Sequence, residues 1–382
     1  MHRIIKTFVL APDSFKESMS AEQVCVVMKN AILQIMPNAK CISIPMADGG
    51  EGTIDALVMA KSGLKIVCEV EGPLPHQKVI THFGLIDDGR TAVIEMAKAN
   101  GIHLVEPISR NPLFTSTFGT GQMIAAALEL GVKKIIIGLG GSVTNDGGAG
   151  MAHALGVKFL DQEQQELRPF GGNLNQIQSI DISGIDRRLT KTEILIASDV
   201  NNPLCGKKGA SYIFGPQKGA TSDIVEQLDQ NLSHYADLVE RLLGVNLRYR
   251  AGAGAAGGLG FGLMAFLNAN LQSGVELIIR ETQLIDQIKS ADYVFTGEGK
   301  IDFQTQFGKT PFGVAQAALQ QSKPVYAFAG RIGEDIETLY DQGFSKIIGI
   351  NPPEQSLEDS MKNAIHNLES TIRNTVLEYI LK

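Results

Sequence analysis

The stretch VKKIIIGLGGSVTNDGGAG, residues 132–150, decides the fold class that this chain must have. Its first six residues form a run rich in Ile and Val that is typical of a buried strand. The remaining part, residues 138–150, contains six glycines. Because α/β proteins place such a loop directly after a buried strand to bind an anion, the stretch predicts an α/β fold and an anion-binding loop.

This glycine loop matches neither of the two common phosphate-binding motifs. Walker A requires a lysine that the loop lacks, and Val143 stands where G-x-G-x-x-G, counted from Gly138, requires its last glycine. The loop instead offers backbone N–H groups and neutral side-chain donors, at Gly140, Gly141, Ser142, Thr144 and Asn145. We therefore expect it to hold an anion, a carboxylate or a phosphate, with the positive charge supplied by Lys16.

The composition is that of a globular protein with substantial cores, since 44% of the 382 residues are hydrophobic and 20% are charged. The formal net charge of −7 argues against a nucleic-acid partner, because nucleic-acid-binding domains carry a basic face. No apolar run approaches the roughly 20 residues of a membrane-spanning helix, and the N-terminal stretch indicates a first strand rather than a signal peptide. Four separated cysteines favour neither a disulfide framework nor a zinc site, which indicates a cytoplasmic location.

Strand-like and helix-like segments alternate along the chain, which predicts parallel or mixed sheets covered by helices. Ser20 with Gln23 forms a capping-box pattern, and Thr310 followed by Pro311 marks another helix start. Residues 72–97 instead predict successive strands joined by polar turns. We expect a doubly wound α/β domain formed by residues 1–72 and 270–382, interrupted by a second, mixed α/β domain at 73–269.

Several loops that follow predicted strands carry carboxylates. Ligands of open α/β sheets bind at the carboxyl ends of the strands, so these positions favour a functional role. Asp48 precedes a Gly-Gly pair, and Asp199 ends a predicted strand. Glu298 and Asp302 are four residues apart, on one face of an extended segment. Carboxylates in such places bind Mg²⁺ or accept a proton, and turn formation or a solvated strand face is the alternative interpretation.

A second glycine-rich stretch, residues 251–262, contains a complete G-x-G-x-x-G match at Gly252, Gly254 and Gly257. That fingerprint binds a dinucleotide only where a strand precedes it, and residues 245–250 are a doubtful strand. The match leaves one alternative function possible, that of a nicotinamide-dependent oxidoreductase acting on a small hydroxy acid. Glycine loops, lysines and carboxylates without a nucleophilic triad suit Mg²⁺-assisted phosphoryl transfer better.

Nine longer motifs follow one another in order along the chain. They are APDSFKESMSAEQV (11–24), PMADGGEGT (45–53), EMAKANGIHLV (95–105), RNPLFTSTFGTGQMI (110–124), GLGGSVTNDGGAGMAHALG (138–156), SDVNNPLCGKKGA (198–210), FGPQKGA (214–220), GAGAAGGLGFGL (252–263) and TGEGKIDFQTQFGKTPFGVA (296–315). Together they resemble the bacterial glycerate kinases of the glycerate kinase I type, from about residue 4 to 350. The departures from the family pattern are small, namely Glu17, Pro75, Asn100 and Val143.

The resemblance implies ATP-dependent phosphorylation of glycerate with Mg²⁺. The usual product in this family is 2-phosphoglycerate, although some members are described as making the 3-phosphate. It also implies two α/β domains, one flavodoxin-like with a doubly wound, mostly parallel sheet, and one inserted. The active site is then expected in the cleft between these domains.

Working roles follow from the loops together with this resemblance. Asp199 is the expected base or orienting carboxylate, and Lys16 the expected cation on the transferring phosphate. Glu298 and Asp302 are expected on the Mg²⁺ side. Substrate binding is expected from Ser142, Thr144, Asn145, Asp48, Arg110 and Arg331, and cofactor binding from Gly140, Gly141, Gly252, Gly254, Gly257 and Gly258.

The expected partners are glycerate and ATP. We expect the protein to bind neither a nucleic acid nor a membrane. Two other functions stay open at this point: the oxidoreductase, and a non-catalytic protein that binds a small acid. The sequence also leaves open which hydroxyl is phosphorylated, which loop holds the carboxylate and which the ATP phosphates, and whether the protein is a monomer or a homodimer.

Overall fold

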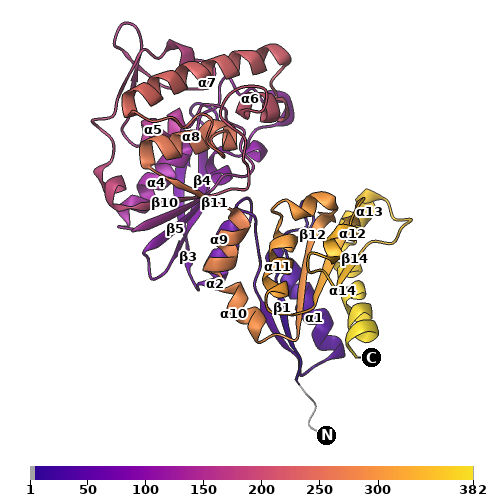
Figure 1. Ribbon diagram of the computed structural model, residues 1–382. Helices are drawn as coiled ribbons and strands as arrows, with labels where there is room; N and C mark the ends of the chain where they lie inside the picture. Colours follow the sequence, from indigo (N-terminus) through magenta and orange to yellow (C-terminus); the bar gives the residue numbers. More distant parts are fainter. Residues whose placement is uncertain (1–4, 382) are drawn as a thin grey trace. The chain divides into compact units, whose positions relative to one another are not determined.

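The computed structural model describes residues 5–381, which divide into two compact units (Figure 1). The first unit consists of the chain up to Asp48, of Asp55–Lys61 and of the chain from Val275 onward. The second unit consists of Gly49–Ile54 and Ser62–Gly274. Each unit is an α/β structure with its own sheet, as the sequence analysis predicted for the fold class.

The second unit extends beyond the expected range of 73–269 because of strand pairing. Strand β3 (Leu64–Glu71) pairs with β4 (Lys78–Ile86) in an antiparallel register. Strand β11 (Asn270–Gln272) pairs with β10 (Glu193–Ala197) in a parallel register. Both outer strands therefore belong to the sheet of the second unit.

The first unit is built on a parallel five-stranded sheet with the order β14-β13-β12-β1-β2. Every strand pair in it is parallel. The strands are β1 (Thr7–Leu10), β2 (Lys40–Ser43), β12 (Tyr293–Ile301), β13 (Val325–Ile332) and β14 (Lys346–Gly349). Taken in chain order as one to five, their spatial order is 2-1-3-4-5, the flavodoxin-like order, whose switch point lies between β1 and β12.

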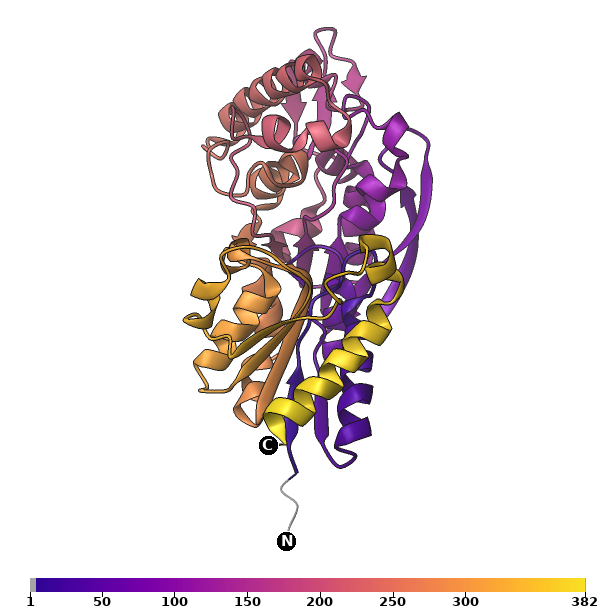
Figure 2. The same cartoon turned by 90° about the vertical axis from the view of Figure 1, so that its right-hand side faces the viewer.

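Helices cover this sheet on both sides. Helix α1 (Ala21–Ile35) begins after the Ser20 capping box, whose side-chain oxygen accepts the N–H of Gln23 at 3.2 Å. Helix α14 (Ala364–Thr375) lies beside α1, where Gln34 donates to Glu369 at 2.8 Å (Figure 2). The other helices are α2 (Thr53–Ala60), α9 (Gly274–Glu281), α10 (Leu284–Lys289), α11 (Thr310–Leu319), α12 (Glu337–Tyr340) and α13 (Leu357–Lys362), and a π-helical turn at Val376–Ile380 follows α14.

The second unit is built on a mixed six-stranded sheet with the order β11-β10-β6-β5-β4-β3. Its strands β5 (Thr91–Glu95), β6 (Lys134–Gly138), β10 and β11 run parallel, whereas β4 is antiparallel to both of its neighbours, β3 and β5. The hairpin-like strands expected at 72–97 are therefore confirmed. A small antiparallel sheet adds β7 (Lys158–Leu160), β8 (Glu166–Leu167) and β9 (Ser179–Asp181).

Helices pack the core of the second unit around buried aromatic rings, including Phe159, Tyr235 and Phe261. The long helix α7 (Ser222–Leu243) lies over α6 (Ala210–Phe214) and α8 (Ala255–Leu267) (Figure 1). The remaining helices are α3 (Ala97–Asn100), α4 (Phe118–Glu129) and α5 (Ala149–Ala154), and short 3₁₀ turns lie at Ile102–Leu104, Pro107–Ser109, Leu174–Gln176, Arg187–Lys191, Pro216–Lys218 and, in the first unit, Phe303–Gln306.

None of the helices formed by residues 5–381 combines the length and the apolar character that crossing a membrane would require.

Helix α8 begins with an unusual left-handed turn. Ala256, Gly257 and Gly258 have φ angles of 52°, 67° and 89°. This turn brings the backbone of α8 so close to the glycine loop that a Cβ at Gly257 would lie 1.9 Å from the carbonyl oxygen of Thr144. Gly257 is therefore needed for both its backbone conformation and its lack of a side chain.

Replacing Gly257 by Ala is expected to destabilise the second unit more than Gly244→Ala. Both glycines have a φ of 67°, so each alanine adds the strain of left-handed backbone, roughly 1–2 kcal/mol. A Cβ at Gly244 meets nothing within 4 Å, whereas the one at Gly257 collides with Thr144. We expect G257A to lower the free energy of unfolding by about 2 kcal/mol more than G244A, as overpacking does. Urea unfolding curves of both variants measure the difference, and equal midpoints would contradict the packing argument.

Candidate functional site

The carboxyl ends of the first unit's strands open into a pocket of about 460 Å³. It lies at the switch point between β1 and β12, where open α/β sheets bind their ligands. Its lining comes from the loops after β1 and β2, from the last residues of β12 and β13, from Lys309 just before α11, and from residues after β14. The lining includes Asp13, Lys16, Asp48, Glu298, Lys300, Lys309, Arg331, Ile350, Leu357 and Met361.

Asp13 lies in the loop directly after β1. Burial, together with the nearby charge of Asp48, raises its pKa to about 6. Its Oδ2 accepts a hydrogen bond from the hydroxyl of Thr310 at 2.6 Å, and its Oδ1 accepts the N–H of Ser14 at 2.6 Å. Asp13 is therefore held in place by two hydrogen bonds, and it is a carboxyl group that titrates close to neutral pH.

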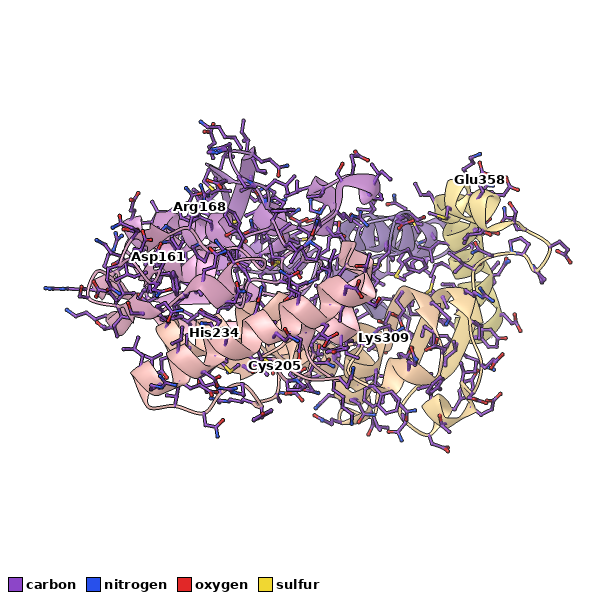
Figure 3. The ribbon with its side chains drawn as sticks, turned by 90° about the horizontal axis from the view of Figure 1, so that it is seen from above. Asp161, Arg168, Cys205, His234, Lys309 and Glu358 are labelled. Carbon is purple, nitrogen blue, oxygen red and sulfur yellow. The ribbon has the colours of Figure 1, made fainter. Side chains whose placement is uncertain are left out.

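Glu298 lies near the end of β12 on the same pocket. Burial raises its pKa to about 7, against the lowering effect of the Lys309 charge. The Lys309 ammonium lies 3.4 Å from Glu298 Oε1, and the hydroxyl of Thr305 donates to that oxygen at 3.1 Å. Lys309, labelled in Figure 3, also donates to the carbonyl oxygen of Lys300 at 3.1 Å.

This carboxylate set fits a Mg²⁺ ion that is shared with a phosphate ligand. Asp13, Asp48 and Glu298 line one pocket. The charge of Asp48 raises the pKa of Asp13, and the charge of Asp13 raises the pKa of Glu298, so a divalent cation would relieve their repulsion. Within residues 5–381 no three His, Cys, Asp or Glu side chains enclose a metal site by themselves. Mg²⁺ is usually bound through one or two carboxylates, with phosphates and water completing its shell.

Asp302, expected beside Glu298 on the metal side, has a different environment. Its Oδ2 lies 2.6 Å from the Lys300 ammonium, and its Oδ1 accepts the N–H of Gln304 at 3.0 Å at the start of a 3₁₀ turn. The hydrogen bond from Lys300 lowers the pKa of Asp302. Among the described residues that line the pocket, Asp302 is absent. Its contacts are those of a residue that caps the 3₁₀ turn.

The cations of this pocket come from several loops. Lys16 and Arg331 are both exposed, and both line the pocket. The charge of Lys16 lowers the pKa of Asp13, which shows that the two groups are electrostatic neighbours. The pocket thus combines carboxylates with four basic side chains, the combination needed to bind a metal-bound polyphosphate.

A second, smaller pocket of about 250 Å³ lies in the second unit, beside the glycine loop. The loop contributes Gly140, Gly141 and Ser142, and the left-handed turn of α8 contributes Ala256. Gln217 and Lys218 add polar groups, while Ile102, Leu139, Val200 and Phe214 form the apolar walls. The glycine loop therefore lines a pocket, as an anion-binding role requires.

Lys218 supplies the positive charge at the glycine loop. Its side chain is 1% exposed, and its ammonium donates to Ser142 Oγ at 2.8 Å and to the Thr144 carbonyl oxygen at 2.6 Å. Burial lowers the pKa of Lys218 to about 7, although the charge of Asp146 acts in the opposite direction. The sequence analysis expected this cation to be Lys16, which lines the pocket of the first unit instead.

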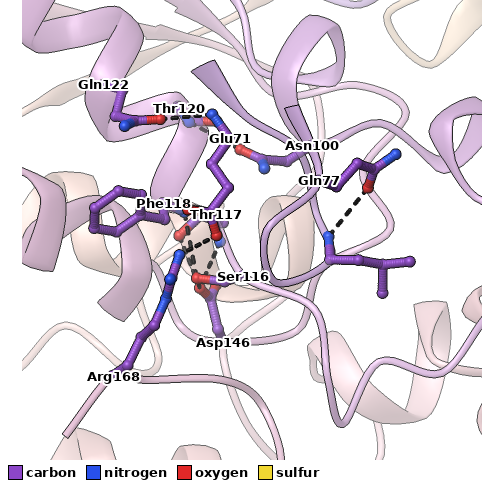
Figure 4. Close-up of polar contacts among 11 residues, drawn as sticks. Glu71, Gln77, Asn100, Ser116, Thr117, Phe118, Thr120, Gln122, Asp146 and Arg168 are labelled. Atoms are coloured by element: carbon purple, nitrogen blue, oxygen red, sulfur yellow. Dashed lines mark hydrogen bonds and ion pairs between the residues drawn. The ribbon is translucent and has the colours of Figure 1, made fainter. Parts of the chain in front are cut away.

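Asp146 fixes the conformation of the glycine loop from inside. Its Oδ2 accepts the N–H of Thr117 at 2.7 Å and the Thr117 hydroxyl at 2.8 Å, as Figure 4 shows. Its carboxylate also accepts the N–H groups of Gly148 and Gly150, each at 3.2 Å. Burial raises the pKa of Asp146, and the hydrogen bonds oppose that shift.

Of the expected neutral donors in the loop, Ser142 lines the small pocket. Thr144 is fully buried, and its carbonyl oxygen accepts from Lys218. Asn145 is also fully buried, and its amide donates to the hydroxyl of Ser211 at 3.3 Å. Thr144 and Asn145 therefore support the loop in this structure.

The glycines of the second glycine-rich stretch serve close backbone packing. Residues 245–254 form no strand in the described chain, so the strand required before the dinucleotide fingerprint is missing. Gly254 donates its N–H to the carbonyl oxygen of Asn202 at 2.9 Å. A Cβ at Gly258 would lie 2.7 Å from Gly147. The fingerprint is therefore not a dinucleotide site, and the oxidoreductase interpretation loses its only support.

Four further expected residues are placed as follows. Asp199 follows β10, and its Oδ1 accepts the N–H of Gly274, the first residue of α9, at 3.2 Å. Arg110 donates to the carbonyl oxygens of Val105 and Ile102 at 3.1 and 3.3 Å, so its guanidinium holds a backbone turn. Arg331 and Asp48 line the large pocket of the first unit.

The fold and the large pocket define a class: an α/β enzyme whose carboxylates and lysines are suited to phosphoryl transfer. The comparisons with known proteins then identify the family. Residues 8–379 match the Glycerate kinase family, and the chain belongs to that family. It is an enzyme, and the reaction of its class is that of a kinase acting on a small-molecule substrate.

The relatives match along nearly the whole chain. The glycerate kinase of Haemophilus influenzae is 49% identical over 96% of this chain and 97% of its own length. The glycerate 2-kinase of Escherichia coli K12 is 45% identical over 96% of both chains. A solved structure from Salmonella typhimurium LT2, assigned as glycerate kinase 2, has a TM-score of 0.87 at 45% identity and covers 98% of both chains.

Sequence reasoning missed Asp13, Lys309 and Lys218 as pocket residues. Asp13 has the signal that identified Asp199, a carboxylate just after a predicted strand, but a turn explains that position equally well. Lys218 carries no such signal, because a lone lysine in a loop gives no indication of burial. Lys309 lies in FGKT (307–310), which ends like Walker A but has Phe303 where the first glycine should stand.

The raised pKa of Glu298 predicts how stability changes with pH. Its folded-state pKa of about 7 exceeds its ordinary value of 4.5. Between these two pH values the folded protein therefore holds a proton that the unfolded chain releases. The stabilising contribution is complete below pH 4.5 and is lost as the pH rises through 7. We therefore expect Glu298→Gln to gain thermal stability relative to the wild type as the pH is raised, measured by calorimetry without nucleotide.

Asp302→Asn is the matched comparison because its shift has the opposite sign. The lowered pKa of Asp302 gives a contribution that is present above its ordinary value and is lost as the pH falls. The Asn variant should therefore be less stable than the wild type near neutral pH and equal to it in acid. Parallel stability profiles of Glu298→Gln and the wild type would contradict the assignment for Glu298.

Proposed function

We propose that this protein transfers the γ-phosphate of ATP to glycerate with the help of Mg²⁺, and that D-glycerate gives 2-phosphoglycerate in the cytoplasm. Membership of the Glycerate kinase family supports the substrate. The relative from Escherichia coli that is named a glycerate 2-kinase supports the 2-phosphate as the product. The absence of a membrane-crossing helix within residues 5–381 is consistent with this location.

The observation that carries the proposal is the pocket at the switch point of the first unit. Its carboxylates, Asp13, Asp48 and Glu298, would hold Mg²⁺ together with phosphate oxygens. The bound ion would neutralise charge on the transferring phosphate. Its cations, Lys16, Lys309 and Arg331, would bind the remaining phosphate charge.

The chemical step joins an oxygen of glycerate to the γ-phosphorus. The bond between that phosphorus and the oxygen bridging to ADP breaks, and the proton of the attacking hydroxyl passes to a base. We propose Asp199 as this base or as the carboxylate that orients the hydroxyl. Asp13 is the second candidate, because a pKa of about 6 suits a proton acceptor near neutral pH.

The proposal predicts that ADP release depends on D-glycerate, ATP and Mg²⁺ together. A coupled assay with the full-length chain measures this, with and without EDTA, and ³¹P NMR identifies the phosphorylated hydroxyl. A protein that only binds a small acid would be stabilised by D-glycerate without releasing ADP. That result would overturn the proposed function, and a 3-phosphate product would correct the proposed hydroxyl.

The base is assigned by comparing Asp199→Asn with Asp13→Asn. Loss of a general base lowers kcat by about 10²–10⁴-fold, and the neutral amide preserves the size of the side chain. We expect that loss in Asp199→Asn, with the KM values little changed. A folded Asp199→Asn enzyme with near-normal turnover would remove Asp199 from this role. A large loss in Asp13→Asn alone would give the role to Asp13 only where raised Mg²⁺ does not restore turnover, because Asp13 is also a proposed Mg²⁺ ligand.

A further inference from the structure

We propose that the small pocket of the second unit binds the carboxylate of the acceptor acid and that Lys218 supplies its positive charge. This inference rests on the proposed function, because the identity of the acid comes from there. It is carried by the contacts of Lys218, by the unused donors of the glycine loop and by the size of the pocket.

Lys218 has one donor left for a ligand. An ammonium group has three N–H donors and accepts nothing. Two of the three are used by Ser142 Oγ and the Thr144 carbonyl oxygen, and the described residues provide no third acceptor. Because Lys218 lines the pocket while being almost fully buried, its third N–H is available only to a molecule inside that pocket.

The glycine loop adds backbone donors beside this lysine. The N–H groups of Gly140, Gly141 and Ser142 donate no hydrogen bond within the described part of the chain. The same three residues line the pocket. A lysine with successive unused N–H groups forms a concave site for a small anion, since a carboxylate accepts through two oxygens.

The size and charge of the pocket favour a carboxylate over a triphosphate. Its volume of about 250 Å³ is little more than half of the 460 Å³ of the pocket in the first unit. Lys218 is the one basic side chain among its lining residues, which balances the single charge of a carboxylate. A triphosphate needs several cations, and the larger pocket offers four, Lys16, Lys300, Lys309 and Arg331. The apolar walls suit a short carbon chain.

The charged groups near Lys218 agree with an anionic ligand. Asp146 is the charged group that acts on it, and the hydrogen-bonding capacity of that carboxylate is taken up by Thr117, Gly148 and Gly150. Arg110 approaches Gly219 through its backbone, while its guanidinium binds the carbonyl oxygens of Ile102 and Val105. A carboxylate beside Lys218 would stabilise the charged ammonium, so ligand binding and proton uptake by this lysine should be coupled.

Lys218→Met tests the inference in the full-length enzyme, because Met keeps the length of the side chain and removes the charge. We expect kcat/KM for D-glycerate to fall by at least about tenfold, as loss of a hydrogen-bonded charge does, while KM for ATP changes less than twofold. Lys207→Met is the matched control, since Lys207 is exposed and stacks on Tyr212 at 4.0 Å. Lys207→Met should behave as the wild type does.

The pH dependence of kcat/KM distinguishes a ligand-binding role of Lys218 from a purely structural one, because a structural role would not change it. In the wild type, kcat/KM for D-glycerate should fall relative to kcat/KM for ATP above pH 7, where Lys218 loses its proton. In Lys218→Met that relative loss should disappear. Should Lys218→Met fail to fold, Ser142→Ala takes its place, and we expect a several-fold rise in KM for D-glycerate alone.

The outcomes separate this inference from the proposed function. Wild-type protein that releases no ADP with D-glycerate overturns the proposed function. Active wild-type enzyme in which Lys218→Met, or Ser142→Ala in its place, raises KM for ATP instead of KM for D-glycerate overturns the inference and assigns the pocket to phosphate. Unchanged kinetics in the tested variant overturn it as well.

Discussion

The second unit depends on a buried carboxylate. Asp146 accepts hydrogen bonds from Thr117 at the start of α4 and from Gly148 and Gly150 at the start of α5, so one side chain joins the glycine loop to both helices. A buried charge of this kind is tolerated only because donors surround it. The consequence is a loop whose first part, Gly140 to Ser142, is left with unused backbone donors. Gly148 and Gly150 thus hold the loop in place through their N–H groups, whereas Gly140 and Gly141 line the small pocket.

The first unit depends on a different constraint, which is topological. In the order 2-1-3-4-5 the chain leaves β1 and β12 in opposite directions around the sheet, so the loops after these strands diverge and leave a crevice. Asp13 and Glu298 are two of the acidic groups placed there. Burial raises the pKa of both carboxyl groups, and the cost of their charge is offset when a cation binds.

The sequence predicted the elements whose signals are local. The strands expected at the N-terminus, within 72–97, before the glycine loop and before Asp199 are confirmed as β1, β4 with β5, β6 and β10. The capping box at Ser20 is confirmed as well, because apolar runs and capping act over a few residues. Strand β2, with the sequence KCIS, and the small sheet β7–β9 were not predicted, because these short segments lack a clear apolar run.

Long-range contacts limited what could be foreseen at the sites. Thr310 was expected to cap α11, but its hydroxyl donates to Asp13, which is 297 positions away, and Lys309 takes the cap position. The burial of Lys218 likewise depends on Ser142 and Thr144, more than 70 positions distant. No local pattern records such pairings, since they arise only when the fold brings the segments together.

Both pockets share one electrostatic principle with opposite signs. Burial disfavours charge, so it raises the pKa of Glu298 and Asp13 and lowers the pKa of Lys218, in each case to a value near neutrality. A cation among the carboxylates and an anion beside the lysine would each restore the charged form. Each site is therefore suited to a ligand of the opposite charge, and the burial of these side chains strengthens that attraction because buried charges are screened less by water.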